Sequence, residues 1–375
     1  MIEEYSLKLL CDKYGVSKEN IVNKNNNILS EGEYEDIDKT LDYLINELKV
    51  SKTNIEKCPS ILYRNVNAIK DNIDFLKQKD VSFSSIESCL HVLSSEPDSL
   101  KDTYDYVEEN YGKESINRNT SVLSCPKDLV IAVEELGLNK DWNLVIASCI
   151  KFGFTTLEEV EDIVNSQEFK KYPELFTSQT LAYGNIKEIQ EMINSKEYKE
   201  HPELFTSQTL AHGSIKEIKE MINREEFKKY PKLFTSQTLA HAKIGDIQKL
   251  LQMPYWNDIR YKDLLTSSVA AKSKQMITKL PVLFKMAEYY KIDGYLNTSF
   301  LLFSPSQNFA LINYLNDNNM PLIENDKLNM VFGKQPGFLK KKYGIDIKEQ
   351  MLKYDFSKFS FGEDTKKGGS KNAVR

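Results

Sequence analysis

The sequence YPELFTSQTLA occupies Tyr172 to Ala182 and returns twice, as HPELFTSQTLA from His201 and as YPKLFTSQTLA from Tyr230. The period is 29 residues, and a weaker copy follows at Leu264-Leu265-Thr266-Ser267. A unit this short cannot bury its apolar side chains alone, so its copies must stack on one another. The repeat predicts an all-α fold, a solenoid or superhelix of stacked helix pairs, whose right- or left-handed sense the sequence leaves open.

Each 29-residue unit is predicted to contain two helices. Proline suits a first helical turn, where its missing N–H is not needed, so a short helix is expected to run from Pro through Leu-Phe to Leu-Ala. A second helix is expected after Ser214, because Ser214 and Glu217 have capping-box spacing, as do Thr156 and Glu159. An apolar stripe follows at Ile215, Ile218, Met221 and Ile222.

The first third of the chain has a different repeat, of about 30–34 residues by the helical pattern. Short helices are expected to start at Ile21, Ile55, Ile86 and Ile116. An apolar pair follows each, at Ile28-Leu29, Ile61-Leu62, Val92-Leu93 and Val122-Leu123. Longer amphipathic stretches lie between the pairs, for example Val66, Ile69, Ile73 and Leu76.

This second pattern resembles the repeat of the mitochondrial transcription termination factor (mTERF) family. The resemblance covers roughly residues 10–140, with a possible echo at Pro336–Gly344, and rests on the Ser-led turn, the Ile, the Pro-Ser-Ile-Leu step and the long helix. It implies a superhelix whose concave side follows a nucleic-acid backbone through basic residues. The sequence departs from that pattern, because residues 1–126 are acidic overall and contain only two arginines, Arg64 and Arg118.

Four segments are predicted along the chain. Residues 1–126 hold the mTERF-like repeats, and residues 127–285 hold the 29-residue helix-pair repeats. Residues 286–356 are rich in aromatic and apolar side chains and are predicted to be a closing helical region. Residues 357–375 are polar and end in a Lys- and Gly-rich stretch, which is typical of a frayed tail.

Composition narrows the class of protein. The 375 residues include 41% hydrophobic and 28% charged side chains, enough for a packed core, while 15 Gly and 11 Pro are too few for an all-β chain. Five cysteines without a CxxC pair are expected to be buried thiols in a reducing compartment. The acidic start and the lack of a long apolar run predict a soluble, cytoplasmic protein without a membrane partner.

The net charge of −5 conceals a gradient along the chain. Residues 1–126 sum to −8 and residues 127–165 to −5, whereas residues 166–260 sum to +1 and residues 261–375 to +7. Long-range attraction of a polyanion therefore favours the C-terminal third.

No arrangement of residues indicates catalysis. The Gly-rich phosphate motifs, HExxH and GxSxG are all absent, and the carboxylates have helix-surface spacing. His212 and His241 share a repeat position with Tyr183, and a metal ligand would not alternate with Tyr. We therefore predict a binding protein and not an enzyme, with no metal and no cofactor.

The Thr-Ser-Gln-Thr row has two interpretations. It would form a ladder of polar side chains facing a ligand, as in RNA readers that use one repeat per base, or it would satisfy helix ends and pack between units. The candidate ligand-facing residues are Gln179, Gln208, Gln237, Tyr183, His212 and His241.

A second candidate surface combines lysines with aromatic residues in the C-terminal third. Its lysines are Lys272, Lys274, Lys279, Lys285, Lys340, Lys341 and Lys342. Lysines beside rings suit phosphate contact and base stacking, although Lys-rich solvated faces are also common. The favoured partner is RNA or single-stranded DNA. The alternative is a protein partner held by the acidic N-terminal half, in a scaffold or inhibitor.

Overall fold

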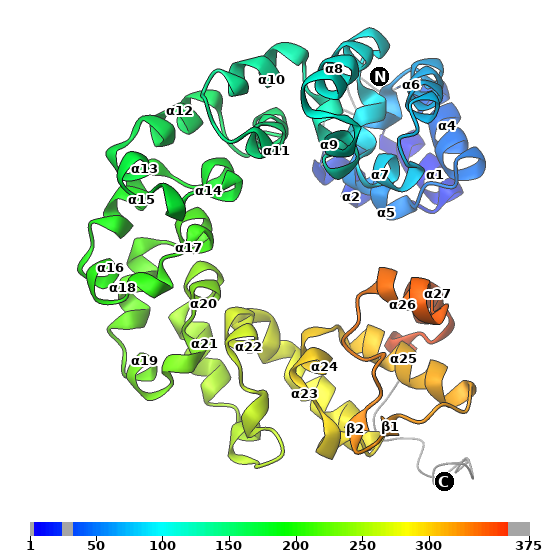
Figure 1. The fold of residues 1–375 in the computed structure, drawn as a ribbon. Coiled ribbons are helices and arrows are strands. Elements are labelled where there is room, and N and C mark those ends of the chain that lie inside the picture. Colours follow the sequence, from blue (N-terminus) through cyan, green and yellow to red (C-terminus); the bar gives the residue numbers. More distant parts are fainter. Residues whose placement is uncertain (1–3, 25–32, 359–375) are drawn as a thin grey trace. The chain divides into compact units, whose positions relative to one another are not determined.

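The computed structural model describes residues 4–24 and 33–358. Helices make up most of these residues, and the strands among them form one two-stranded hairpin, so the all-α repeat fold is confirmed. The chain packs as two compact units, residues 1–186 and 187–375. The division falls within the 29-residue repeats, and Figure 1 shows the helices of both units.

Unit 1 is a succession of short helices and 3-10 turns. Its elements are α1 (Glu4–Tyr14), α2 (Lys18–Lys24), α4 (Tyr34–Asp42), the π-helix η1 (Tyr43–Glu47), α5 (Lys52–Lys57), η2 (Pro59–Tyr63), α6 (Val66–Gln78), α7 (Phe83–Ser88), η3 (Leu90–Ser94), α8 (Pro97–Tyr111), α9 (Lys113–Arg118), η4 (Thr120–Ser124), α10 (Lys127–Glu134), α11 (Lys140–Lys151), α12 (Leu157–Asn165), α13 (Gln167–Lys171), η5 (Pro173–Leu175) and α14 (Ser178–Tyr183).

Two parallel rows organise unit 1. The 3-10 turns η2, η3 and η4 pack side by side, and α11 and then α14 continue their row. The longer helices α4, α6, α8 and α10 pack in sequence as the second row. The apolar pairs Ile61-Leu62, Val92-Leu93 and Val122-Leu123 lie in the 3-10 turns and are buried between the rows. Burial of these side chains is the main force that holds successive repeats together.

The predicted helix starts in the N-terminal repeats were wrong by one turn. Ile21, Ile55, Ile86 and Ile116 each lie three residues inside their helix, as in α5, which begins at Lys52. The buried Ile anchors the helix from within, so the apolar signal follows the helix start. Ile28-Leu29 lies outside the described residues.

Glutamates join neighbouring N-terminal repeats. The Glu56 carboxylate accepts a hydrogen bond from the Ser17 backbone N–H at 2.7 Å, and Glu87 accepts one from the Ser51 N–H at 2.8 Å. Each serine precedes a short helix, and each glutamate comes from the next repeat along the chain. Because backbone donors at a helix start have no intrahelical partner, these bonds tie helix ends to the register between repeats.

Unit 2 contains the remaining copies and the C-terminal region. Its elements are α15 (Ile186–Ile193), α16 (Lys196–Glu200), η6 (Pro202–Leu204), α17 (Ser207–His212), α18 (Ile215–Ile222), α19 (Glu225–Lys229), η7 (Pro231–Leu233), α20 (Ser236–His241), α21 (Ile244–Leu251), η8 (Pro254–Asn257), η9 (Lys262–Leu264), α22 (Ser267–Ala271), α23 (Ser273–Tyr289), η10 (Asp293–Tyr295), α24 (Thr298–Leu302), α25 (Pro305–Asp317), β1 (Ile323–Glu324), β2 (Lys327–Leu328), α26 (Pro336–Tyr343), α27 (Ile347–Lys353) and η11 (Phe356–Lys358).

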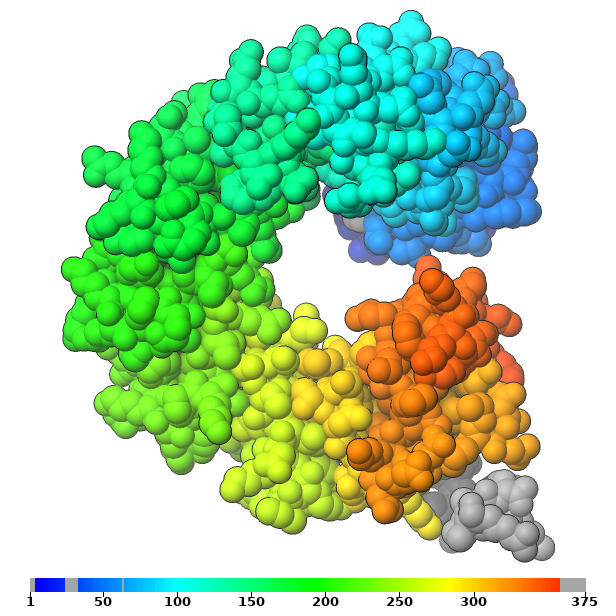
Figure 2. All heavy atoms as spheres, in the orientation of Figure 1, coloured from blue at the N-terminus to red at the C-terminus, as the bar shows by residue number. Residues whose placement is uncertain are grey.

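Two rows of helices also build unit 2. The short helices α17, α20, α22 and α24 follow one another in the first row, which we call the short-helix row. In the second row α18, α21, α23 and α25 pack in turn. The apolar stripe predicted at Ile215, Ile218, Met221 and Ile222 is buried. Heavy atoms of successive repeats are in continuous contact within this unit (Figure 2).

The repeat differs from the predicted helix pair in two respects. The Pro-Glu-Leu segment forms a separate 3-10 turn, and two non-helical residues, Phe205 and the extended Thr206, separate this turn from α17. A further five-residue helix, such as α19, precedes each turn. The predicted single short helix from Pro to Ala was therefore wrong. The Phe beside the Thr is buried, and the break in the helix allows this burial.

One of the two predicted capping boxes is present and the other is absent. Thr156 and Glu159 form the capping box that begins α12. Ser214 makes no side-chain cap bond, so its predicted capping box with Glu217 was wrong. The Glu188 carboxylate of the preceding repeat instead accepts a hydrogen bond from the Ile215 N–H at 2.9 Å. A glutamate from a neighbouring repeat therefore caps the backbone N–H at the start of α18, as glutamates also do at Ser17 and Ser51.

The C-terminal region of unit 2 packs around α23 and α25. Phe284 of α23 stacks on Tyr261 with ring centroids 4.3 Å apart, and Leu311 and Leu315 of α25 join the same buried cluster. The predicted closing helices are present, but β1 and β2 form a hairpin that the sequence did not predict. Asn325 and Asp326 between the strands both have positive φ, the conformation that a two-residue hairpin turn requires. Residues 359–375 of the predicted tail lie outside the described residues.

Candidate nucleic-acid interface

A ring-bearing side chain lies at the end of the first-row helix in three successive repeats. It stands six residues after the threonine that precedes the helix, as Tyr183 at the end of α14 in unit 1 and as His212 and His241 at the ends of α17 and α20 in unit 2. All three are exposed. We call the two histidines of unit 2, His212 and His241, the ring row; Tyr183 is their counterpart in unit 1.

The two histidines of unit 2 lie against each other. Their ring centroids are 5.3 Å apart, and the ring planes differ by 35°. The side-chain amide of Gln208, one turn before His212, is 3.0 Å from Nε2 of His241. A glutamine of one repeat therefore contacts the ring of the next, so two of the predicted ligand-facing positions form one connected surface. Gln237 is half-buried one repeat further along.

Tyr183 is held at the equivalent position of unit 1. Its ring packs edge-on against Phe154 with centroids 5.6 Å apart, and the Cys149 thiol donates to its hydroxyl at 3.8 Å. The side chain is still 43% exposed. Gln179, one turn earlier on α14, is also exposed. The ring of Tyr183 is thus oriented by neighbours and open to a ligand.

The short-helix row of unit 2 extends the same position into the C-terminal region. Lys272 lies six residues after Thr266, which precedes α22, and Phe303 lies six residues after Asn297, which precedes α24. Both line a hollow of about 430 Å³, together with Gln307. After two histidines, this position therefore supplies a cation and then an aromatic ring.

The second threonine of each TSQT block is structural. Thr180, Thr209 and Thr238 are fully buried. The Thr209 hydroxyl donates to the Leu204 carbonyl at 2.7 Å, and the Thr238 hydroxyl donates to Leu233 at 2.6 Å. Each also lies 3.4 Å from a carbonyl of the next repeat, Ser236 or Ser267. The packing interpretation of the row is therefore confirmed at these threonines.

The surroundings of His212 favour its neutral form near pH 7. Burial and the neighbouring His241 lower the pKa of His212 below its ordinary value. Neutral imidazoles offer flat faces and hydrogen-bonding edges, which suit contact with nucleobases. Positive charge for contact with phosphates would therefore have to come from lysines close to the ring row.

The structure separates the predicted lysines into groups. Burial lowers the pKa of Lys279, and the nearby charge of Lys272 lowers it further. Lys340 is paired with Asp346 at 2.8 Å, and Lys342 lies over the rings of Phe338 and Tyr343.

The remaining predicted lysines are solvent-facing. Lys274 and Lys341 are exposed and form no ion pair among the described residues, and Lys285 is exposed as well. Lys272 and Lys279 thus sit together beside the short-helix row.

The described part of the chain shows no metal-binding group of three or more His, Cys, Asp or Glu residues. Cys11, Cys58, Cys125 and Cys149 are buried, and Cys89 is partly buried. Burial raises the pKa of Cys58 and of Cys125 to about 12, which disfavours the reactive thiolate. Among the described residues, no helix has the length and apolar character that a membrane crossing needs.

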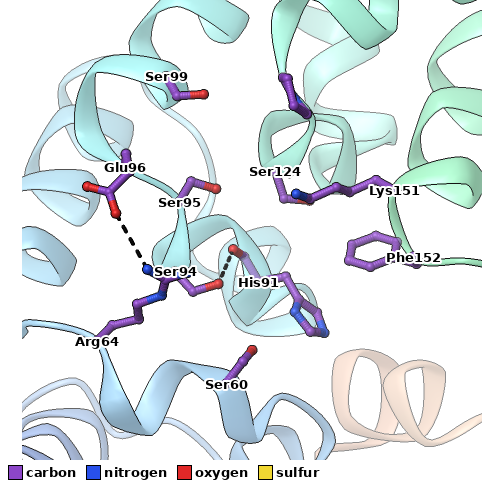
Figure 3. Close-up of a pocket in the computed structure, with 11 residues that line it drawn as sticks. Ser60, Arg64, His91, Ser94, Ser95, Glu96, Ser99, Ser124, Lys151 and Phe152 are labelled. Carbon is purple, nitrogen blue, oxygen red and sulfur yellow. Dashed lines mark hydrogen bonds and ion pairs between the residues drawn. The ribbon is translucent and has the colours of Figure 1, made fainter. Parts of the chain in front are cut away.

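Unit 1 contains a groove that sequence reasoning missed. It has a volume of about 510 Å³ and runs past the C-terminal ends of η2, η3, η4 and α11. Figure 3 shows Arg64 and Glu96 on one side, Lys151 and Phe152 on the other, and His91 between them. Five serines also line the groove: Ser60, Ser94, Ser95, Ser99 and Ser124. The lining residues come from four repeats. Because the η turns recur at the same position of each repeat, that position was the one sequence signal that could have indicated the groove.

Comparison of the chain with protein-family models, curated proteins and solved structures finds no match. The mTERF resemblance therefore stays a prediction.

Proposed function

We propose that this chain is a non-catalytic helical-repeat protein that binds RNA or single-stranded DNA along the ring row. The observation that carries the proposal is the repetition of one exposed ring per 29-residue repeat, with Gln208 bridging to the ring of the next repeat at 3.0 Å. Side chains that recur at repeat spacing suit a ligand that is itself a repeating chain.

The chemistry of the row favours nucleic acid over a protein partner. The imidazole rings of the row can stack on nucleobases, and base–aromatic stacking contributes about 1–3 kcal/mol per base. Lys272 and Lys279 lie where the short-helix row continues, and they supply charge for phosphates. The duplex is the less suitable form, because its base faces are already stacked and the first 126 residues hold few arginines.

Ring-row substitutions test this proposal. His212→Ala and His241→Ala should each weaken binding of a mixed-sequence single-stranded RNA by about 5-fold or more, as expected for the loss of one stacking contact. Fluorescence anisotropy of a labelled oligonucleotide gives the affinities. The matched control is Tyr230→Ala, which removes an aromatic side chain of the same repeats that precedes η7 and is not a member of the ring row. If this control weakens binding as much as His241→Ala, the ring row is not the interface.

A protein partner remains the second candidate because of the charge of unit 1. Residues 1–126 sum to −8, and α1 exposes Tyr5 and Leu9 one turn apart. A surface of this kind suits a basic partner with an apolar contact. Stoichiometric capture of a basic protein that His212→Ala and His241→Ala leave intact would favour this second function.

A further inference from the structure

The unit 1 groove combines three features that recognise different parts of one small ligand. It has two cationic side chains, several hydroxyl groups and a pair of flat rings. It is distinct from the ring row, and the proposal below does not depend on that row.

The groove has one cation on each side (Figure 3). Arg64 meets the carboxylate of Glu96 at 3.4 Å, with the two side chains 45% and 78% exposed. An ion pair so long and so exposed is weak, so a bound phosphate can displace it. Lys151 is exposed on the opposite side and forms no ion pair among the described residues. The groove therefore has two cations against one carboxylate, although the surrounding repeats are acidic.

The hydroxyl groups of the groove divide into structural ones and free donors. Ser94 donates to the His91 carbonyl at 2.7 Å, and Ser124 donates to the Ser121 carbonyl at 2.6 Å. These two hold the 3-10 turns. Ser95 and Ser99 form no side-chain hydrogen bond among the described residues, so their hydroxyls remain able to donate to a phosphate oxygen.

The rings give the groove an aromatic wall. His91 and Phe152 pack with centroids 4.9 Å apart and ring planes tilted by 53°, and both are partly exposed. Burial and the charge of Lys151 lower the pKa of His91, so its imidazole is neutral at pH 7. A neutral ring beside a phenyl ring favours a planar aromatic group over a second anion.

We propose that this groove binds a nucleoside monophosphate group, with the phosphate between Arg64 and Lys151 and the base against His91 and Phe152. Cations and hydroxyls alone would suit any phosphate, and the ring wall alone would suit any aromatic compound. Their conjunction in a volume of about 510 Å³ matches a nucleotide, since small-ligand sites span roughly 300–1,000 Å³. The group belongs either to a free nucleotide or to the 5′ end of a strand.

Calorimetric titration of the full chain with 5′-AMP tests the proposal. AMP should bind, and adenosine and inorganic phosphate should each bind at least about 10-fold more weakly. Arg64→Gln and Lys151→Gln should each weaken AMP binding about 10-fold or more. Glu96→Gln should strengthen it, because Arg64 is released and a negative charge is removed. No AMP binding at millimolar concentration overturns the proposal.

Arg118 and Glu114 provide the matched controls. They form an exposed ion pair at 3.0 Å in unit 1 but do not line the groove. Arg118→Gln and Glu114→Gln should leave AMP binding unchanged within about 2-fold, as expected for an exposed surface pair. If Arg118→Gln weakens AMP binding as much as Arg64→Gln, the effect is one of general charge and the site is refuted.

Oligonucleotides distinguish the two sources of the group. A preference for a 5′-phosphorylated over a 5′-hydroxyl strand that Lys151→Gln abolishes identifies a strand end, whereas AMP binding without this preference identifies a free nucleotide. His212→Ala should leave AMP binding unchanged. The proposal for the groove and the proposal for the ring row can therefore be refuted independently of each other.

Discussion

Replacement of Thr209 by Val should destabilise the protein without weakening its binding to single-stranded RNA. Thr209 is fully buried, and its hydroxyl donates to the Leu204 carbonyl at 2.7 Å and contacts the Ser236 carbonyl of the next repeat at 3.4 Å. Valine keeps the shape but removes the donor, so the Leu204 carbonyl loses this partner. An unsatisfied buried polar group costs about 1–3 kcal/mol of unfolding free energy, and that range is the expected loss.

Urea denaturation followed by circular dichroism measures this loss, with Thr206→Val as the matched control. Thr206 is half-buried in the same repeat and makes no side-chain cap bond, so the same substitution should cost less than about 0.5 kcal/mol. Equal losses in the two variants would refute the structural role assigned to the second threonine. Weakened RNA binding by Thr209→Val with unchanged stability would return this threonine to the ligand-facing row.

Three further outcomes are expected. Glu87→Ala should lower the unfolding free energy by about 0.5–2 kcal/mol in urea denaturation, because the Ser51 N–H loses the carboxylate that accepts its bond; a loss no larger than that of Glu114→Ala, an exposed surface glutamate, would contradict the inter-repeat cap. Cys58 and Cys125, whose buried thiols have a pKa of about 12, should react with a thiol reagent at pH 8 only as fast as the protein unfolds, and prompt labelling of both would oppose their burial. Single-stranded RNA should bind more tightly only as the pH falls below 6.5, the ordinary histidine pKa, because the lowered pKa of His212 shifts its protonation to lower pH and a polyanion favours the protonated ring; the rise should largely disappear in His212→Gln, and a rise of the same size in that variant would exclude the histidine as its source.

Repetition made the architecture predictable. Because the TSQT block occurs three times, the alternation of helices and the buried stripe at Ile218 and Met221 followed from the sequence. The exposure of Tyr183, His212 and His241 was also accessible, because these positions vary within an otherwise constant block. Variation at fixed spacing is the expected behaviour of an exposed position in a repeat.

Interactions between repeats were not predictable. The sequence around Ser214 has the local spacing of a capping box, but Glu188 of the preceding repeat takes the Ile215 N–H. The groove was missed for the same reason, since Arg64, His91 and Lys151 meet only after the 3-10 turns stack. The C-terminal hairpin depends on two positive-φ residues, Asn325 and Asp326, within a short polar stretch that has no strand pattern.

Affinity for nucleic acid as a function of salt tests the proposed function most directly. Anisotropy titrations with mixed-sequence single-stranded RNA, single-stranded DNA and duplex DNA at about 50 and about 200 mM salt compare the three classes. If two to four lysines, Lys272 and Lys279 among them, neutralise phosphates of a single strand, this change in salt should weaken binding by roughly 7- to 50-fold. That loss is expected for a single strand, with weaker binding of the duplex. No binding at the lower salt, or an affinity that salt does not change, would contradict it.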